Sequence, residues 1–81
     1  MVKDAQIGGD HYQTAIRPIE YIARNGLDFN QGSIVKYVTR YRQKNKDEDV
    51  KKIIHYALFI LSYEYGYDEE QIAEFLKRFV K

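Results

Sequence analysis

Hydrophobic residues recur along the chain with the spacing of amphipathic helices, and no segment keeps the period-two alternation of a strand. The segment from residue 34 to 41 shows the i, i+3, i+4, i+7 pattern of one helical face with Ile34, Tyr37, Val38 and Tyr41. Similar stripes run through residues 50–65 and 72–80. The pattern therefore predicts an all-α fold.

Helix boundary signals divide the first half of the chain into two helices. Pro18 suits the first turn of a helix because its missing N–H has no intrahelical partner there. Asn25-Gly26 is a usual C-terminal signal for that helix. Asn30 is the predicted N-cap of a second helix that runs to about Gln43.

Two more helices follow in the second half. The acidic run 47–49 favours a helix start, since the helix dipole stabilises negative charge there, and Gly66 predicts the end of this helix at about residue 65. Asp68 with Gln71 is a capping-box pattern for a fourth helix. We expect one domain over residues 1–81, a compact bundle of three to four helices. It comprises an irregular N-terminal arm (1–15), core helices (16–65) and an additional C-terminal helix (66–81).

The third predicted helix is apolar on nearly its whole circumference. Its main stripe, predicted to face the core, consists of Val50, Ile54, Ala57, Leu58, Leu61 and Tyr65. The far side carries Tyr56, Phe59 and Tyr63, and aromatic residues are enriched at subunit interfaces. Two interpretations of this far side remain open: the N-terminal arm or the fourth helix covers it, or it contacts another subunit of a homo-oligomer.

Composition narrows the classes of protein. The chain has no cysteine, which excludes disulfides and thiolate metal sites, and its formal net charge is +1. No stretch of about 18 apolar residues could cross a bilayer, so we expect a cytoplasmic protein with no membrane partner. No Cys/His cluster indicates a metal site, and no cofactor is implied.

A basic face on the second helix is the most informative polar pattern. Its members are spaced to share one side of the helix: Ser33, Lys36, Tyr37, Arg40 and Lys44. Lys36 and Arg40 lie one turn apart and repel each other, so some negative charge should offset them. The carboxylates of residues 47–49 could supply it within the fold, a bound phosphate could supply it from outside, or the face is simply solvated.

The N-terminal arm contains a second candidate element, Gly8-Gly9-Asp10-His11-Tyr12. Two glycines allow a backbone turn that can bind an anion, and the neighbouring side chains add a titratable group and a stacking face. There is no P-loop sequence, so a P-loop kinase is not indicated.

Several blocks of the chain, in order and spacing, resemble the SaV-like family of small bacteriophage proteins over residues 8–63. The blocks are Gly9-Asp10-His11-Tyr12, Pro18–Ile22, Asn25-Gly26-Leu27, Gly32–Tyr41, and Glu48–Lys52 followed by His55-Tyr56. The resemblance implies a phage origin, with the cytoplasm of the host cell as location. It also makes nucleotide binding plausible, since one larger relative is a coliphage kinase of deoxynucleoside monophosphates that lacks a P-loop.

By this resemblance the site comprises arm and helix residues together. They are Gly9, Asp10, His11, Tyr12, Lys36, Tyr37, Arg40, Glu48 and Lys52. We expect Lys36 and Arg40 to contact phosphate, Tyr12 or Tyr37 to stack on a base, and His11 to donate a hydrogen bond or carry a proton.

Three functions are consistent with these features. The first is binding of a nucleotide or another phosphate-bearing ligand, in deoxynucleotide metabolism or nucleotide sequestration, with a nucleoside monophosphate kinase activity left open. The second is inhibition of a host or defence protein through the tyrosine-rich surface. The third is nucleic-acid binding through the second helix, which the near-zero net charge disfavours.

Overall fold

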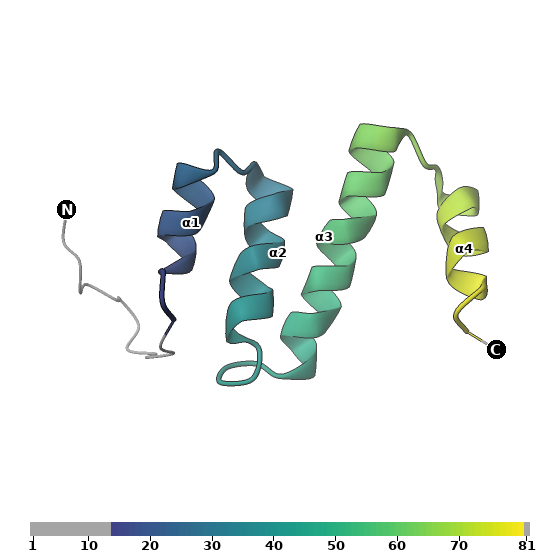
Figure 1. Cartoon of the computed structure of the whole chain (residues 1–81). Coiled ribbons are helices and arrows are strands. Elements are labelled where there is room, and N and C mark those ends of the chain that lie inside the picture. The colour runs from purple at the N-terminus through teal and green to yellow at the C-terminus, as the bar shows by residue number, and fades with distance from the viewer. Residues whose placement is uncertain (1–13, 81) are drawn as a thin grey trace.

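The computed structural model describes residues 14–80, which form four α-helices and no strand. The helices are α1 (Pro18–Arg24), α2 (Phe29–Arg40), α3 (Asp47–Tyr65) and α4 (Glu69–Lys77). They follow one another side by side in chain order (Figure 1). The predicted all-α bundle of three to four helices is confirmed. Residues 1–13, which make up most of the predicted arm (1–15), lie outside the described residues.

The ends of α1 agree with the sequence signals. Pro18 occupies the first turn, and the helix is followed by Asn25 and by Gly26, whose φ is +61°. This left-handed conformation favours glycine because it lacks a Cβ. The backbone N–H of Leu27 then donates to the carbonyl oxygen of Ile22 at 3.0 Å, which closes the end of the helix.

Both predicted ends of α2 were wrong. The N-cap is Asp28 rather than Asn30, because Asp28 and Gln31 form a reciprocal capping box in which each side chain accepts from the other's backbone N–H. The helix ends at Arg40 rather than Gln43. The chain must reverse within residues 41–46 for α3 to return beside α2, and Lys46 takes a φ of +54° to do so.

The predicted bounds of α3 and the predicted start of α4 are confirmed, but α4 ends at Lys77, before the Phe79 and Val80 that were expected on its apolar side. Gly66 ends α3 with a φ of +72°, and its N–H donates to the carbonyl oxygen of Ser62. Asp68 accepts from the N–H of Gln71 at 2.8 Å, and the Gln71 side chain accepts from the N–H of Asp68 at 3.0 Å. This capping box starts α4 where the sequence predicted it.

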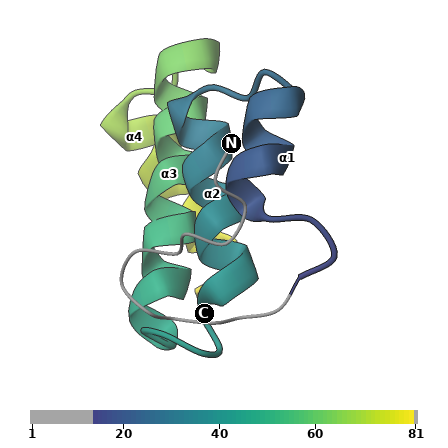
Figure 2. The same ribbon diagram turned by 90° about the vertical axis from the view of Figure 1, so that its left-hand side faces the viewer.

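Close packing joins α1 to α2 and α2 to α3, whereas α4 lies beyond α3 without such packing (Figures 1 and 2). The α1–α2 contact depends on a small residue. Gly32 of α2 is buried, and a Cβ built there would lie 3.0 Å from Cγ2 of Ile22. A glycine at this point therefore lets the two helices approach.

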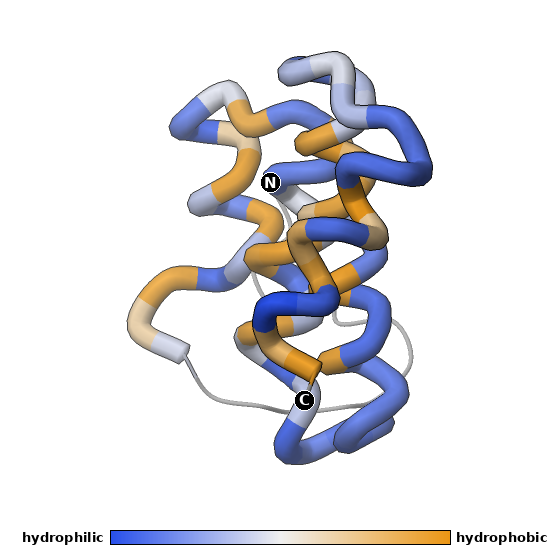
Figure 3. The backbone as a smooth tube through the Cα atoms, turned by 90° about the vertical axis from the view of Figure 1, so that its right-hand side faces the viewer, coloured by the Kyte–Doolittle hydropathy of each residue, from blue (hydrophilic) through white to orange (hydrophobic). Residues whose placement is uncertain are grey.

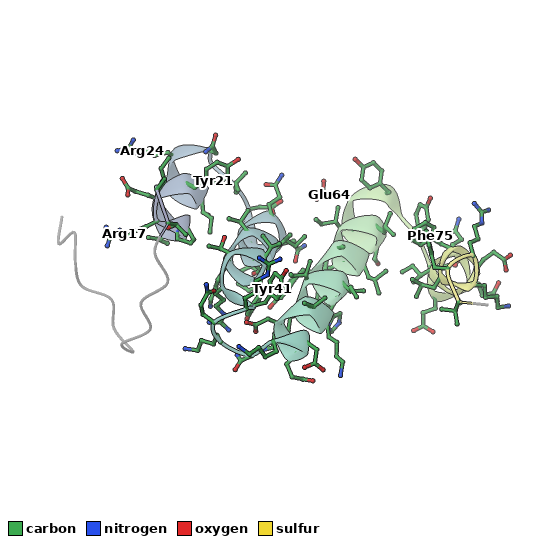
Figure 4. All side chains as sticks on the ribbon, turned by 60° about the horizontal axis from the view of Figure 1, so that its bottom comes forward. Arg17, Tyr21, Arg24, Tyr41, Glu64 and Phe75 are labelled. Carbon is green, nitrogen blue, oxygen red and sulfur yellow. The ribbon has the colours of Figure 1, made fainter. Side chains whose placement is uncertain are left out.

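The side of α3 that faces α2 is not the one predicted. In the main stripe, expected to form the core, Val50, Ile54 and Tyr65 are exposed while Leu58 and Leu61 are half-buried, and no hydrophobic side chain among residues 14–80 is fully buried. The α2 side instead carries Asp49 and Tyr56 (Figure 4 shows the side chains of α2 and α3 meeting near the labelled Tyr41). Hydrophobicity alone misled here because α2 offers a guanidinium and a tyrosine ring, which pair with a carboxylate and another ring.

Candidate functional site

The α2–α3 contact is centred on a buried ion pair. Arg40, in the last turn of α2, donates from Nε to Oδ2 of Asp49 at 3.1 Å and from a terminal nitrogen to Oδ1 at 3.3 Å. Asp49 lies in the first turn of α3, and its side chain is 0% exposed. Asn45 adds a third hydrogen bond, from Nδ2 to Oδ1 at 3.3 Å. The carboxylate is thus held by donors on both of its oxygens.

The pKa of Asp49 reflects this arrangement. Burial acts to raise the pKa of the carboxyl, because a charge is costly away from water. The hydrogen bonds from Arg40 and Asn45, together with the charge of Arg40, act in the opposite direction and hold the pKa below its ordinary value of 3.8. Asp49 is therefore ionised at neutral pH and neutralises Arg40.

Three cations surround the ring of Tyr37. The Nζ atoms of Lys36 and Lys52 lie 5.3 Å and 5.2 Å from the ring centroid, and the guanidinium carbon of Arg40 lies 4.8 Å from it. These distances are within the range of cation–π attraction. Lys36 comes from α2 and Lys52 from α3, so the fold brings together two ammonium groups that are distant in sequence.

The charge of this cluster is unbalanced. Asp49 is the one carboxylate that approaches it among residues 14–80; its bidentate partner is Arg40, and Lys52 Nζ is 4.0 Å from its Oδ1. Lys36 is exposed and makes no ion pair with any described residue. Within residues 14–80, three positive charges and one negative charge leave a local excess of two positive charges beside Tyr37.

A row of rings continues from Tyr37 along α3. Tyr37 stacks on Tyr56, with ring centroids 6.0 Å apart and planes inclined by 16°. Tyr56 in turn contacts Phe59 at 5.9 Å, and Phe59 lies 4.4 Å from His55. Aromatic surface therefore lies next to the cationic cluster on the same side of α3.

The structure brings together only part of the site that the sequence predicted. Lys36, Tyr37, Arg40 and Lys52 form the cluster described above. Glu48 is exposed and accepts instead from Lys51 Nζ at 3.2 Å. The remaining candidates, Gly9, Asp10, His11 and Tyr12, lie outside the described residues.

The sequence left open what offsets the repulsion between Lys36 and Arg40. For Arg40 the answer is a carboxylate of the fold, Asp49, and this single residue was not distinguished from its acidic neighbours beforehand. Its spacing offered a signal: Asp49 shares one side of α3 with Tyr56, seven residues later.

Tyr56, Phe59 and Tyr63, the residues predicted to form a subunit interface, differ in how far they are buried. Tyr56 is half-buried and packs on Phe29 and Tyr37 of α2, so α2 covers this part of the helix. Phe59 is also half-buried. Tyr63 is 75% exposed and stacks on Phe59 at 5.7 Å. Whether another subunit contacts them stays a prediction.

An apolar depression lies elsewhere, between α1 and α2. Its volume is about 460 Å³, and it is lined by Thr14, Ala15, Ile16, Pro18, Tyr21, Val35 and Thr39. No charged side chain lines it. A phosphate would find no counter-charge there, so this depression is not a candidate anion site.

The described part of the chain has neither a metal-binding cluster nor a membrane-spanning helix. Residues 14–80 hold no group of three His, Cys, Asp or Glu side chains placed to bind a metal ion. Nor does any helix there have the length and apolar character needed to span a bilayer.

Comparison with known proteins supplies a family but no named relative. No curated protein and no solved structure matches the chain. Residues 6–58 match the model of DUF3310, described as a protein family of unknown function. This segment includes the Tyr37 cluster and ends within α3, so α4 lies outside it. Because the match spans more than half of the 81 residues, the chain belongs to the DUF3310 family.

Proposed function

We propose that this protein binds a nucleotide through the Tyr37 cluster, with the phosphate between the ammonium groups of Lys36 and Lys52. The observation that carries the proposal is the convergence of these two lysines, from different helices, on one tyrosine ring at 5.3 Å and 5.2 Å. A phosphate would balance the local excess of positive charge, and charge-assisted hydrogen bonds to it are among the stronger polar contacts in proteins.

Arg40 has a positioning role in this proposal rather than a direct one. Two of its donor groups already bind Asp49, and its guanidinium lies 4.8 Å from the Tyr37 ring. The pair fixes the end of α2 against the start of α3, which sets the separation between Lys36 and Lys52. This differs from the sequence-based hypothesis, in which Arg40 contacts phosphate together with Lys36.

The aromatic row favours a nucleotide over inorganic phosphate. Lys52, His55 and Phe59 are spaced i, i+3, i+7, so they share one side of α3. A phosphate at Lys52 would leave the base of the same molecule beside the rings of His55 and Phe59. Stacking of a base on an aromatic side chain contributes about 1–3 kcal/mol. The predicted arm, Gly9–Tyr12, is the remaining part of this proposed site.

Isothermal titration calorimetry with a deoxynucleoside monophosphate tests the proposal. Lys36→Ala and Lys52→Ala should each weaken binding by about tenfold or more, since each removes a charged partner worth about 1.5–3 kcal/mol. Inorganic phosphate should bind more weakly than the nucleotide and lose affinity in the same two variants. His55→Ala should weaken binding of the nucleotide but not of inorganic phosphate.

Lys51→Ala is the matched control. Lys51 is adjacent to Lys52 but pairs with Glu48 and Asp47, at 3.2 Å and 3.9 Å, away from the Tyr37 cluster. Its removal should leave binding unchanged. Absence of binding by the unmodified protein at millimolar nucleotide, or equal effects of Lys51→Ala and Lys52→Ala, would contradict the proposal. Native mass spectrometry of the purified protein would detect a nucleotide that co-purifies.

A further inference from the structure

Two apolar surfaces on the α4 side of the molecule are left largely uncovered by residues 14–80. On α3 the uncovered residues are those predicted to form the core, and Val50, Ile54 and Tyr65 are exposed while Leu58 and Leu61 are half-buried. On α4 the exposed residues are Phe75 and Leu76, followed by Phe79 and Val80. Figure 3, viewed from this side, shows the hydrophobic segments along both helices.

Helix α4 needs a packing partner to be stable. It has nine residues, and isolated helices shorter than about 12–15 residues are marginal in water. Its apolar residues fall on one side, whereas Glu70, Glu74 and Lys77 fall on the other. On the apolar side the rings of Phe75 and Phe79 contact each other, with centroids 5.1 Å apart, and Ile72 is half-buried. No other helix of residues 14–80 packs closely on α4, so most of this side is left uncovered by the described part of its own chain.

The uncovered area is of the size that a stable dimer requires. The seven exposed residues, Val50, Ile54, Tyr65, Phe75, Leu76, Phe79 and Val80, retain 36–76% of their accessible surface. This amounts to roughly 800 Å² in total, since one aromatic residue presents up to about 250 Å². A stable protein–protein interface covers about 800 Å² on each partner. Monomeric proteins of ordinary stability rarely leave an apolar surface of this size in water.

We propose that a second copy of this chain covers this surface, with α4 of each copy lying along the outer side of α3 of the other. The outer side of α3 is defined here by Val50, Ile54, Leu58, Leu61 and Tyr65. A two-fold axis would place both α4 stripes on both α3 stripes at once, so the surface is complementary to itself. The lengths fit, because α4 spans about 14 Å and α3 about 28 Å.

The incomplete burial of apolar side chains among residues 14–80 favours a second copy over an unrelated partner. No hydrophobic side chain there is fully buried, and Ile53, Leu58 and Ile60 of α3 are half-buried, so a single chain removes its apolar surface from water only in part. A partner that is always present at folding is another copy of the same chain. The proposed surface lies on the side of α3 opposite the Tyr37 cluster, and the inference does not depend on the proposed function.

Analytical ultracentrifugation over a range of protein concentrations tests this inference. The chain has a mass of 9.7 kDa, and the expected result is a species of twice that mass. Ile54→Glu and Phe79→Glu should each shift the mass to that of one chain, because each places a charge in the apolar contact. Tyr63→Glu is the control: Tyr63 is exposed on the other side of α3, and this variant should retain the doubled mass.

Cross-linking keeps the inference testable if the charged variants fail to fold. The chain contains no cysteine, so single cysteines report on one position each. Chains with Ile54→Cys mixed with chains with Phe79→Cys should form a mixed disulfide faster than either variant forms its own. A single-chain mass at the highest concentration would overturn the proposal, and so would a doubled mass lost in Tyr63→Glu but kept in Ile54→Glu. Lack of a preferred mixed disulfide would also overturn it.

Discussion

The two long sides of α3 differ in how they are used. The side facing α2 carries a buried carboxylate, Asp49, and a stacked ring, Tyr56, each with a specific partner on α2. The side facing α4 carries the longer run of aliphatic residues, and no other described helix packs closely on it. Directional pairs therefore help to hold α3 against α2, while the more hydrophobic side is the one proposed to contact a second copy of the chain.

The α2 side and the α4 side of α3 are proposed to have separate roles. The α2–α3 contact collects the charged and aromatic residues proposed to bind a nucleotide, and it lies within the segment that matches the DUF3310 family. The α3–α4 surface extends beyond that segment, since the match ends at residue 58. Changes on one side of α3 should therefore leave the function of the other side intact.

Removing Arg40 should have the largest effect on the stability of the fold. Arg40→Ala leaves Asp49 as a buried charge without its bidentate partner, which should lower the free energy of unfolding by about 3 kcal/mol. Urea denaturation monitored by circular dichroism measures this. Arg42→Ala is the matched control, because Arg42 is exposed and its guanidinium carbon lies 5.6 Å from the centroid of the Tyr41 ring. Its backbone carbonyl, which alanine retains, accepts from Lys46 Nζ.

A double variant separates the loss of a pair from the loss of packing. Arg40→Leu combined with Asp49→Leu removes both charges, and replacing a whole buried pair with apolar residues is often nearly neutral. The double variant should therefore be more stable than Arg40→Ala. Equal stability of Arg40→Ala and Arg42→Ala would show that directional pairing does not hold α3 against α2.

Acid should weaken the α2–α3 contact next most strongly. The pKa of Asp49 is lower in the folded protein than its ordinary value of 3.8, so its pairing stabilises the fold above that pH. The contribution is lost as the pH falls below about 3.8 and through the folded-state pKa. Urea titrations at a series of pH values should show this decline. Asp49→Asn should show a smaller decline, and an unchanged pH dependence in that variant would contradict the assignment.

A substitution in the connection between α3 and α4 should have a smaller effect on stability, and it should act on the α4 side of α3. Gly66 has a φ of +72°, and an alanine there would adopt the left-handed conformation at a cost of about 1–2 kcal/mol. Gly66→Ala should lower stability by about 1 kcal/mol and weaken self-association, while nucleotide affinity stays constant. Calorimetric unfolding and ultracentrifugation measure the first two quantities. A change in nucleotide affinity equal to that of Lys52→Ala would show that the two sides are coupled.

The smallest effect on the free energy of unfolding is expected at the α1–α2 contact. Alanine in place of glycine inside a helix usually stabilises by about 0.5–1 kcal/mol. At Gly32 the added Cβ would meet Ile22 at 3.0 Å, so the side chain of Ile22 must move. Gly32→Ala should therefore fail to raise the free energy of unfolding, and a gain of the full amount would show that α1 packs loosely.

Local signals in the sequence were sufficient for much of the fold. Pro18, Gly66 and the Asp68–Gln71 capping box each act on the backbone within a few residues of themselves. The structure confirms the helix boundaries that they predict. The start of α2 was misplaced because Asn30 and Asp28 are both good N-caps. The choice between them depends on whether a Gln lies three residues later.

Contacts between helices could not be predicted in the same way. The hydrophobic pattern of residues 50–65 predicts that α3 has an apolar side. It does not indicate which neighbouring helix covers that side. Whether Arg40 meets Asp49 or a ligand depends on how residues 41–46 turn, and Lys46 reverses the chain with a positive φ that its residue type does not favour. Lys52 comes within 5.2 Å of the Tyr37 ring centroid, which Lys36 also approaches, only once that turn is made.

The most direct test of the account compares two neighbouring positions on α3. Ile53 is half-buried and lies on the same side as Asp49, whereas Ile54 is exposed on the other side. In a chain without other cysteines, the labelling rates of Ile53→Cys and Ile54→Cys by a thiol reagent report on the cover of each side. We predict slow labelling of Ile53→Cys at every protein concentration. Labelling of Ile54→Cys should be fast in dilute solution and become slower as the concentration rises. Faster labelling of Ile53→Cys than of Ile54→Cys in dilute solution would contradict the account.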